Sequence, residues 1–331
     1  MITFEKLSQQ PQAFRSLTGM NLSEFHALFA TFAQAQTARR AAATTTRRDN
    51  KPRQRASGAG RRFANDEQTR LVMALVWLRI YPTFQVLGFF FSLHKSNAHP
   101  NVMDVLCTLE SLTEFTFERP AQERKALGSV GAVMDAFPDV ALVIDAKEQR
   151  IRRPKSSKED DKQRPYYSGK KKAHTLKTQV GVQPNGKIGV ISDSVPGGAN
   201  HDLTLLRKSK VLDNLDEDEA AMMDKGYDGI AKDYPDKRLY LPFKARRGHP
   251  LTPEQKAHNR HLSSYRIVVE HVNARLNQFG ALSQVWRGGR DEQHTRTVRV
   301  VAGLVNRRTE TIPLKTYPAP PCPIPARVAT A

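Results

Sequence analysis

The stretch Asp139-Val140-Ala141-Leu142-Val143-Ile144-Asp145 decides the class of the fold. It is a short apolar run with β-branched residues between two acids, which is typical of a buried β-strand ending at Asp145. Residues 148–153 are expected to return beside it as a hairpin strand. Further strand patterns lie at 174–182, 187–194, 220–224 and 238–241, and helical patterns lie at 202–212 and 265–279. This order predicts an α/β domain over residues 138–310.

The composition points to a polyanionic partner. Of the 331 residues, 52 are lysine or arginine and 33 are aspartate or glutamate, which gives a net charge of +19 and a pI near 10.1. Such a surface attracts nucleic acid first and an anionic membrane second. The length predicts roughly two domains. Together with a hydrophobic content of 39%, it excludes a disulfide-stapled mini-protein and a collagen-like chain.

Cysteine usage and hydropathy indicate the compartment. Cys107 and Cys322 lie far apart without the CxxC spacing of a zinc finger, and this usage fits a reducing cytosol. The N-terminus has no apolar core of a signal peptide, and Arg79 and Pro82 interrupt the most apolar window, residues 71–93. We therefore expect a cytoplasmic, nucleoid-associated protein that does not enter the membrane.

The segments outside the α/β domain differ in composition. Residues 1–38 repeat apolar side chains at three- and four-residue steps, which predicts helices. Residues 39–62 are rich in arginine and almost free of apolar side chains, which predicts a basic mobile linker. That linker is either a solvated connection or an arm that contacts phosphates. Residues 311–331 are rich in proline and alanine, and we expect a disordered tail.

Residues 63–125 predict a DNA-binding helix-turn-helix region. Asn65 resembles a helix N-cap, and Ser96 is expected to cap a further helix that follows a turn at 92–94. The alternative is a helix pair that only packs the core. If the region binds DNA, the second helix would read bases in the major groove through Lys95, Asn97, His99 and Asn101.

Three acids far apart in the chain could share one metal site. Asp145 and Asp224 end predicted strands, and Glu270 lies in the long C-terminal helix. Acids at neighbouring strand ends and on an adjacent helix can converge at one sheet edge, and magnesium prefers carboxylate ligands. Each acid also has an ordinary explanation. Strand-end aspartates form turns, and Glu270 follows Arg266 at the spacing of a helical ion pair.

Longer motifs surround these acids. They are Val143-Ile144-Asp145, Tyr167-Ser168-Gly169-Lys170-Lys171-Lys172-Ala173-His174-Thr175-Leu176-Lys177, Pro196-Gly197-Gly198-Ala199-Asn200-His201-Asp202, Asp224-Lys225-Gly226-Tyr227 and Tyr265-Arg266-Ile267-Val268-Val269-Glu270-His271. With these motifs in this order, the chain resembles bacterial insertion-sequence transposases of the DDE superfamily, in the group related to eukaryotic Harbinger transposases. Residues 71–106 are similar to that group's helix-turn-helix.

The resemblance implies an RNase H-like nuclease domain whose catalytic residues and metal ligands are Asp145, Asp224 and Glu270. Two magnesium or manganese ions would activate the attacking water or 3′-hydroxyl and neutralise charge on the leaving oxygen. Asp202 is a rival for the second acid, with N-capping as its alternative role, and His201 and Asp202 are possible accessory residues of the site. The group often has a lysine seven residues after the glutamate, whereas this chain has Asn277.

We expect DNA contacts on both sides of the acids. Tyr265 and Arg266 would meet DNA near the scissile bond, unless Arg266 only pairs with Glu270. The basic stretch before the second acid would hold phosphates, unless it is merely a solvated hairpin. Its candidate residues are Lys170, Lys172, His174 and Lys177.

The function implied by the resemblance is that of a transposase. It would bind the terminal inverted repeats of an insertion sequence as double-stranded DNA, cut the DNA and transfer the strands to a target. Holding two DNA ends implies a homodimer or a larger assembly on DNA. Two alternatives stay open: a catalytically retired transposase that acts as a sequence-specific DNA-binding regulator, and an RNase H-like nuclease without strand transfer.

Overall fold

The computed structural model describes residues 1–44, 63–112, 115, 117, 140–155, 163–289 and 291–314. The chain divides into two compact units. The first contains Met1–Thr116 with the short segments Gln278–Leu282 and Arg299–Val301, and the second contains the remainder. Residues 45–62 of the predicted linker and 315–331 of the predicted tail lie outside the described residues. In the part that is described, no helix combines the length and hydropathy needed to cross a membrane.

The first unit is helical, as predicted. Two helix starts differ from expectation, because Asp66 and His94 are the N-caps in place of Asn65 and Ser96. Asp66 Oδ1 accepts a hydrogen bond from the Thr69 amide at 2.7 Å, which is the usual N-cap geometry. The helices are α1 (Phe4–Ser8), α2 (Pro11–Thr18), α3 (Leu22–Thr44), α4 (Glu67–Ile80), α5 (Phe84–Phe90) and α6 (Lys95–Glu110).

Helix α3 continues into the segment predicted as a linker from residue 39. Its end contains helix-forming alanine and arginine. Arg39 pairs with Asp104 at 2.7 Å, and Arg40 pairs with Glu67 at 2.5 Å. These partners on α6 and α4 explain why the helix extends to Thr44. The predicted boundary at 39 is therefore wrong by about one and a half helical turns.

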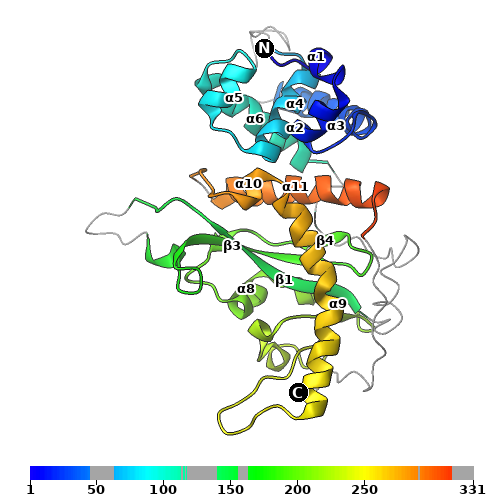
Figure 1. The fold of residues 1–331 in the computed structure, drawn as a ribbon, viewed down its shortest axis with the longest axis vertical. Coiled ribbons are helices and arrows are strands. Elements are labelled where there is room, and N and C mark those ends of the chain that lie inside the picture. The colour runs from blue at the N-terminus through cyan, green and yellow to red at the C-terminus, as the bar shows by residue number, and fades with distance from the viewer. Residues whose placement is uncertain are drawn as a thin grey trace. The chain divides into compact units, whose positions relative to one another are not determined.

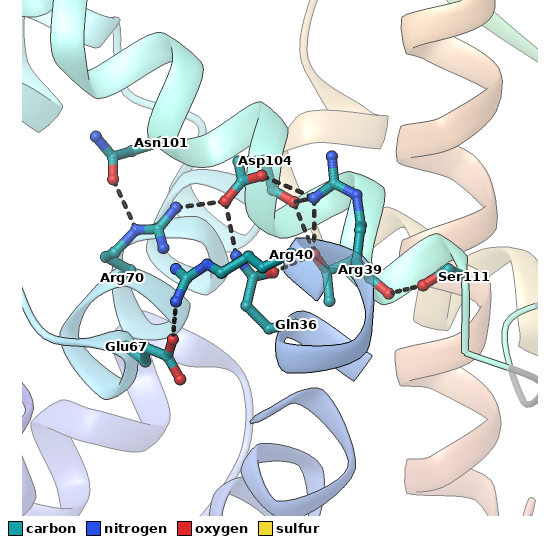
Figure 2. Close-up of polar contacts among 9 residues, drawn as sticks. Gln36, Arg39, Arg40, Glu67, Arg70, Asn101, Asp104 and Ser111 are labelled. Carbon is teal, nitrogen blue, oxygen red and sulfur yellow. Dashed lines mark hydrogen bonds and ion pairs between the residues drawn. The ribbon is translucent and has the colours of Figure 1, made fainter. Parts of the chain in front are cut away.

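A buried ion pair joins α4 to α6 in the first unit (Figure 2). The Arg70 side chain is fully buried, and its Nη2 donates to Asp104 Oδ2 at 2.6 Å. Arg70 Nε donates to Asn101 Oδ1 at 2.8 Å, and Gln36 of α3 donates to Asp104 Oδ2 at 2.9 Å. The guanidinium also lies 3.7 Å from the centroid of the Phe63 ring. Three helices are thus fixed to one carboxylate.

The second unit is built on a mixed sheet (Figure 1). Strands β4 (Ile188–Ile191), β3 (Ala173–Val182), β1 (Val140–Arg150), β6 (Ala220–Met222) and β7 (Arg238–Tyr240) follow one another across it. The pairs β4–β3 and β3–β1 are antiparallel, whereas β1–β6 and β6–β7 are parallel. This is an RNase H-like topology, and it confirms the predicted α/β class.

Strand β1 differs from expectation because it runs through to Arg150. Residues 148–150 continue the same strand, and Glu148 pairs in register with Lys177 of β3. The apolar run stops at Ile144, but the antiparallel ladder with β3 does not, because backbone hydrogen bonds do not depend on side-chain polarity. The predicted hairpin strand over 148–153 is therefore absent from this described stretch.

The remaining helices and short elements complete the described chain, and residues 278–282, which include most of the short helix after α9, belong to the first unit. Helix α9 begins well before the predicted residue 265 and contacts β1 and β3 (Figure 1), while α8 supplies Leu206 to a core with Leu142 and Ile144. The helices are α8 (Asp202–Ser209), α9 (Pro253–Asn277), α10 (Gly280–Ser283) and α11 (Asp291–Thr311). The short elements are β2 (Tyr167–Ser168), β5 (Val195–Pro196), η2 (Arg164–Tyr166), η3 (Val211–Asn214), η4 (Lys225–Tyr227) and η5 (Ile230–Lys232).

We expect Asp104→Ala to destabilise the first unit strongly. The change leaves the Arg70 guanidinium buried without its carboxylate, which typically costs about 3–5 kcal/mol. Urea titration followed by circular dichroism measures the loss. The matched control is Glu67→Ala, which removes only the exposed pair with Arg40 and should cost less than about 1 kcal/mol. Similar losses for both variants would contradict the central role of the buried pair.

Candidate active site

Asp145 lies inside strand β1, not at its end as predicted. Side chains alternate across a strand, so Leu142 and Ile144 enter the core with α8 while Asp145 faces helix α9. Asn273 of α9 donates from Nδ2 to Asp145 Oδ2 at 3.2 Å. The alternation of side chains along β1 therefore directs Asp145 toward α9.

The charge balance around Asp145 is unfavourable for its ionised form. Burial raises the pKa of Asp145 above its ordinary value, and the neighbouring carboxylates of Asp224 and Asp202 raise it further. The Ala146 amide and the Arg266 guanidinium act in the opposite direction but do not cancel the rise. Asp145 thus sits in a cluster of negative charge that favours a cation.

Asp224 follows strand β6 and caps the short helix η4. Its carboxylate accepts a hydrogen bond from the Lys225 amide, and its Oδ2 lies 3.9 Å from Arg266 Nη2. Tyr227, at the end of η4, is buried in the core of the domain and fixes this loop. Strand β6 pairs with β1 in parallel, with Met222 opposite Val143. Asp224 and Asp145 each follow this pair by two residues, so they lie next to each other on the same face of the sheet.

Asp202 lies against the same loop. It is the first residue of α8, and a Cβ on Gly226 would come within 3.0 Å of its Oδ2. The helix N-cap is His201, whose side chain makes no capping hydrogen bond, so the alternative N-cap role for Asp202 is wrong. Asp202 Oδ1 instead pairs with Lys177 Nζ at 3.0 Å.

Lys177 does not fit the predicted phosphate contact. Only 8% of the residue is exposed, and its ammonium also donates to the Asn200 carbonyl at 3.0 Å. Residues 175–182 of strand β3 are all buried, and helices α8 and α9 both contact this strand. Lys177 compensates the charge of Asp202 within the protein.

Glu270 is exposed on α9, between two residues that contact the other acids. Arg266 is one turn before it and Asn273 one turn after it, so the three share one face of the helix. Glu270 therefore lies on the face of α9 that meets Asp145 and Asp224. Among the described residues, however, no three His, Cys, Asp or Glu side chains are gathered closely enough to hold a metal ion.

Arg266 and Tyr265 differ in surroundings from the prediction. The Arg266 side chain is 14% exposed, approaches Asp224, and leaves Nε buried without a hydrogen-bond partner in the described part of the chain. Tyr265 is 3% exposed and its ring lies 4.8 Å from that of His261, centroid to centroid. The buried ring leaves no surface for the predicted DNA contact, whereas Arg266 lies beside the acids.

The turn between β2 and β3 presents basic side chains to solvent. Lys170 and Lys172 are exposed, and Lys172 adopts a left-handed φ of 49°. His174 is half-buried, with its ring 5.6 Å from that of Tyr167, centroid to centroid. These three residues keep the accessibility that their predicted phosphate contacts require.

Two asparagines on α9 were missed by sequence reasoning as site residues. Asn273 bonds Asp145, and Asn277 accepts a hydrogen bond from Lys147 of β1. Burial lowers the pKa of Lys147 to about 8. The helical spacing of 266, 270, 273 and 277 is the signal that would have found them, because it marks one face of α9.

The predicted base-reading residues separate into two groups. Lys95, Asn97 and His99 are exposed near the start of α6. Asn101 is buried and accepts from Arg70, so a base-reading role for it is wrong.

Comparison with known proteins shows the family of the chain. Residues 144–306 match the DDE superfamily endonuclease family. The chain is 32% identical over 248 residues to the probable transposase for insertion sequence element IS702 of Microchaete diplosiphon, covering 75% of this chain and 82% of that protein. No solved structure gives a significant match. The chain therefore belongs to the insertion-sequence transposases with a DDE superfamily endonuclease domain, and it is a DNA-cleaving enzyme.

Proposed function

We propose that this transposase binds the terminal inverted repeats of its insertion sequence, cuts there and transfers the strands to a target. The observation that carries the proposal is the meeting of three elements at one side of the sheet. Asp145 of β1 contacts Asn273 of α9, and Asp224 after β6 approaches Arg266 of the same helix. Glu270 lies between these two contacts on α9.

The side chains at this position suit a divalent cation, and endonucleases of this superfamily use divalent metals. Asp145, Asp224 and Glu270 are proposed as ligands, with Asp202 as an accessory. Carboxylate oxygens are the ligands that magnesium and manganese prefer. The Asn273 Oδ1 atom, beside Asp145, is buried without a hydrogen-bond partner among the described residues and is a further oxygen donor.

A pair of such ions would lower the pKa of an attacking water and neutralise charge on the leaving 3′ oxygen. The protein's own residues hold the acids in place. Asn273 orients Asp145, Lys177 holds Asp202, and Arg266 offsets part of the charge on Asp224. Glu270 is exposed on the same face of α9, from which it would complete the set of acids.

The first unit is proposed to recognise the DNA ends through a helix-turn-helix formed by α5 and α6. Gly88 supports this assignment, because a Cβ there would lie 2.3 Å from the Leu93 carbonyl oxygen. The helix α5 can therefore approach the turn only with glycine at this position. Lys95 and Asn97 lie exposed at the start of α6, where recognition helices contact bases. Since two ends must be held together, a dimer or larger assembly on DNA is expected.

We expect Asp145→Asn to stabilise the protein at neutral pH in a chelator-containing buffer. Burial raises the folded-state pKa of Asp145 above the ordinary value of about 3.9, so ionisation favours the unfolded chain. The advantage of asparagine should therefore grow as pH rises from about 3.9 through the folded-state pKa and vanish below this range. Urea titrations at several pH values measure it.

The matched control is the exposed Asp236→Asn, which should change stability by less than about 0.5 kcal/mol. Magnesium should then raise the melting temperature of the unaltered protein and raise that of Asp145→Asn much less. A variant that is less stable than the parent in chelator would contradict the crowded-carboxylate description of the site.

Cleavage is the direct test of the proposed catalytic acids. Asp145→Asn, Asp224→Asn and Glu270→Gln should each reduce cleavage of an inverted-repeat duplex at least about 10³-fold, with binding little changed. Chelation of metal should have the same effect, and a strand-transfer assay with pre-cut ends tests the joining step. Binding without cleavage by the unaltered protein would favour the retired regulator, and cleavage without joining would favour a simple nuclease.

Base reading by α6 predicts a loss of specificity. Lys95→Ala or Asn97→Ala should weaken binding to the element's ends about 5- to 150-fold, and binding to random DNA less, because each base contact discriminates by about 1–3 kcal/mol. Fluorescence anisotropy with both duplexes at fixed salt measures the ratio. Lys6→Ala, on exposed α1, is the control. An equal loss on both duplexes would rule out base reading.

A further inference from the structure

A second basic surface lies between β7 and α9, away from the residues considered so far. From Lys237 to Pro253 the sequence contains no aspartate or glutamate. We call residues 243–252 the basic arm. Its exposed cationic or titratable side chains, with two that follow on the first turns of α9, are Lys244, Arg246, Arg247, His249, Lys256 and Arg260.

The base of the arm is held in a fixed conformation. Buried Asn259 of α9 bonds the backbone of Phe243 in both directions, accepting from its amide at 2.7 Å and donating to its carbonyl at 2.9 Å. Thr252 and Gln255 form a reciprocal capping box at the start of α9, with distances of 3.2 and 3.1 Å. Both ends of the arm are thus anchored on the same helix.

The tip of the arm is also closed by hydrogen bonds. The Arg246 amide donates to the His249 carbonyl at 3.2 Å, and the His249 amide donates to the Arg246 carbonyl at 2.9 Å. Gly248 completes the turn with a φ of +80°, which favours glycine. Arg246 and Arg247 make no ion pair with any described residue. Two guanidinium groups are therefore presented on an ordered turn.

Two contacts within the second unit connect the arm to the segment that carries Asp224. The Met223 amide, one residue before Asp224, donates to the Tyr240 carbonyl at the end of β7 at 3.1 Å. Lys244 pairs with Asp228, just after η4, at 3.5 Å. From Pro253 to Arg266, helix α9 covers about 20 Å, the length of about six DNA base pairs.

We propose that the basic arm binds backbone phosphates of a DNA duplex about six base pairs from the phosphate being cut. The inference rests on the proposed function, since it takes the acids to be the cleavage site. A rigid turn that presents two arginines suits phosphate oxygens. The tip residues Ala245, Arg246, Arg247, Gly248 and His249 offer no large apolar side chain for a membrane.

The test is salt-dependent binding by the full chain in chelator, where no cleavage occurs. Arg246→Ala/Arg247→Ala should lower the slope of log affinity against log salt by about 1.8, since each phosphate contact contributes about 0.9. Lys210→Asn/Lys232→Ala removes the same charge from exposed positions elsewhere in the unit and should leave the slope nearly unchanged. Asn259→Ala keeps every charge but frees the base of the arm, and it should weaken binding less than the double arginine change does.

Two duplexes identify the DNA that the arm holds. A slope change only with an inverted-repeat duplex assigns the arm to the element's end, and a change only with random duplex assigns it to target DNA. In either case, trimming the duplex to three base pairs beyond the cut should abolish the difference. Unchanged slopes with both duplexes overturn the proposal, as does an equal change in the control.

The two proposals fail separately. Cleavage by Asp145→Asn would refute the catalytic assignment. It would not change the salt dependence of DNA binding by the arm variants, which is measured without cleavage. Unchanged slopes would refute the arm while leaving metal-dependent cleavage by the parent protein intact. Circular dichroism of each variant checks that a smaller salt slope does not result from unfolding of the protein.

Discussion

Repulsion between carboxylates that share one side of a sheet is the constraint on which the catalytic domain depends. Asp145 is partly buried, and the neighbouring Asp224 and Asp202 both disfavour its charge. Each of these acids has a hydrogen-bond donor or a cation nearby. Asn273 donates to Asp145, Arg266 lies near Asp224, and Lys177 pairs with Asp202. These contacts come from α9 and β3, so the packing of both elements against β1 is inseparable from the electrostatics of the acids.

The first unit contains a buried cation, Arg70, that is paired with the carboxylate of Asp104. Burial alone would raise the pKa of Asp104, but hydrogen bonds from Arg70, Gln36 and Arg39 outweigh it, so the pKa is lowered. The pair therefore contributes stability at neutral pH that is lost as acid protonates the carboxylate. Because α3, α4 and α6 all meet at Asp104, the orientation of α6 depends on this one residue.

Sequence patterns predicted element types better than their ends. The apolar run 140–144 identified β1, but its polar continuation could not be read from hydropathy, because the ladder with β3 supplies the energy there. The acids were recognised by their motifs. The burial of Lys177 beside Asp202, and of Asn101 beside Arg70 in the first unit, was not recognised, since it depends on which tertiary partner lies opposite. The predicted tail begins where α11 ends at Thr311.

The continuity of α9 has a consequence for how this chain can vary. One uninterrupted helix carries Asn259 near its first turns and Arg266, Glu270 and Asn273 further along. Inserting a single residue between Asn259 and Arg266 would rotate one end of the helix against the other by about 100°. Glu270 would then turn away from Asp145 and Asp224. Insertions and deletions should therefore be tolerated in the surface loops but not in this stretch of α9. The helix fixes the distance between the anchor of the basic arm and the proposed catalytic acid.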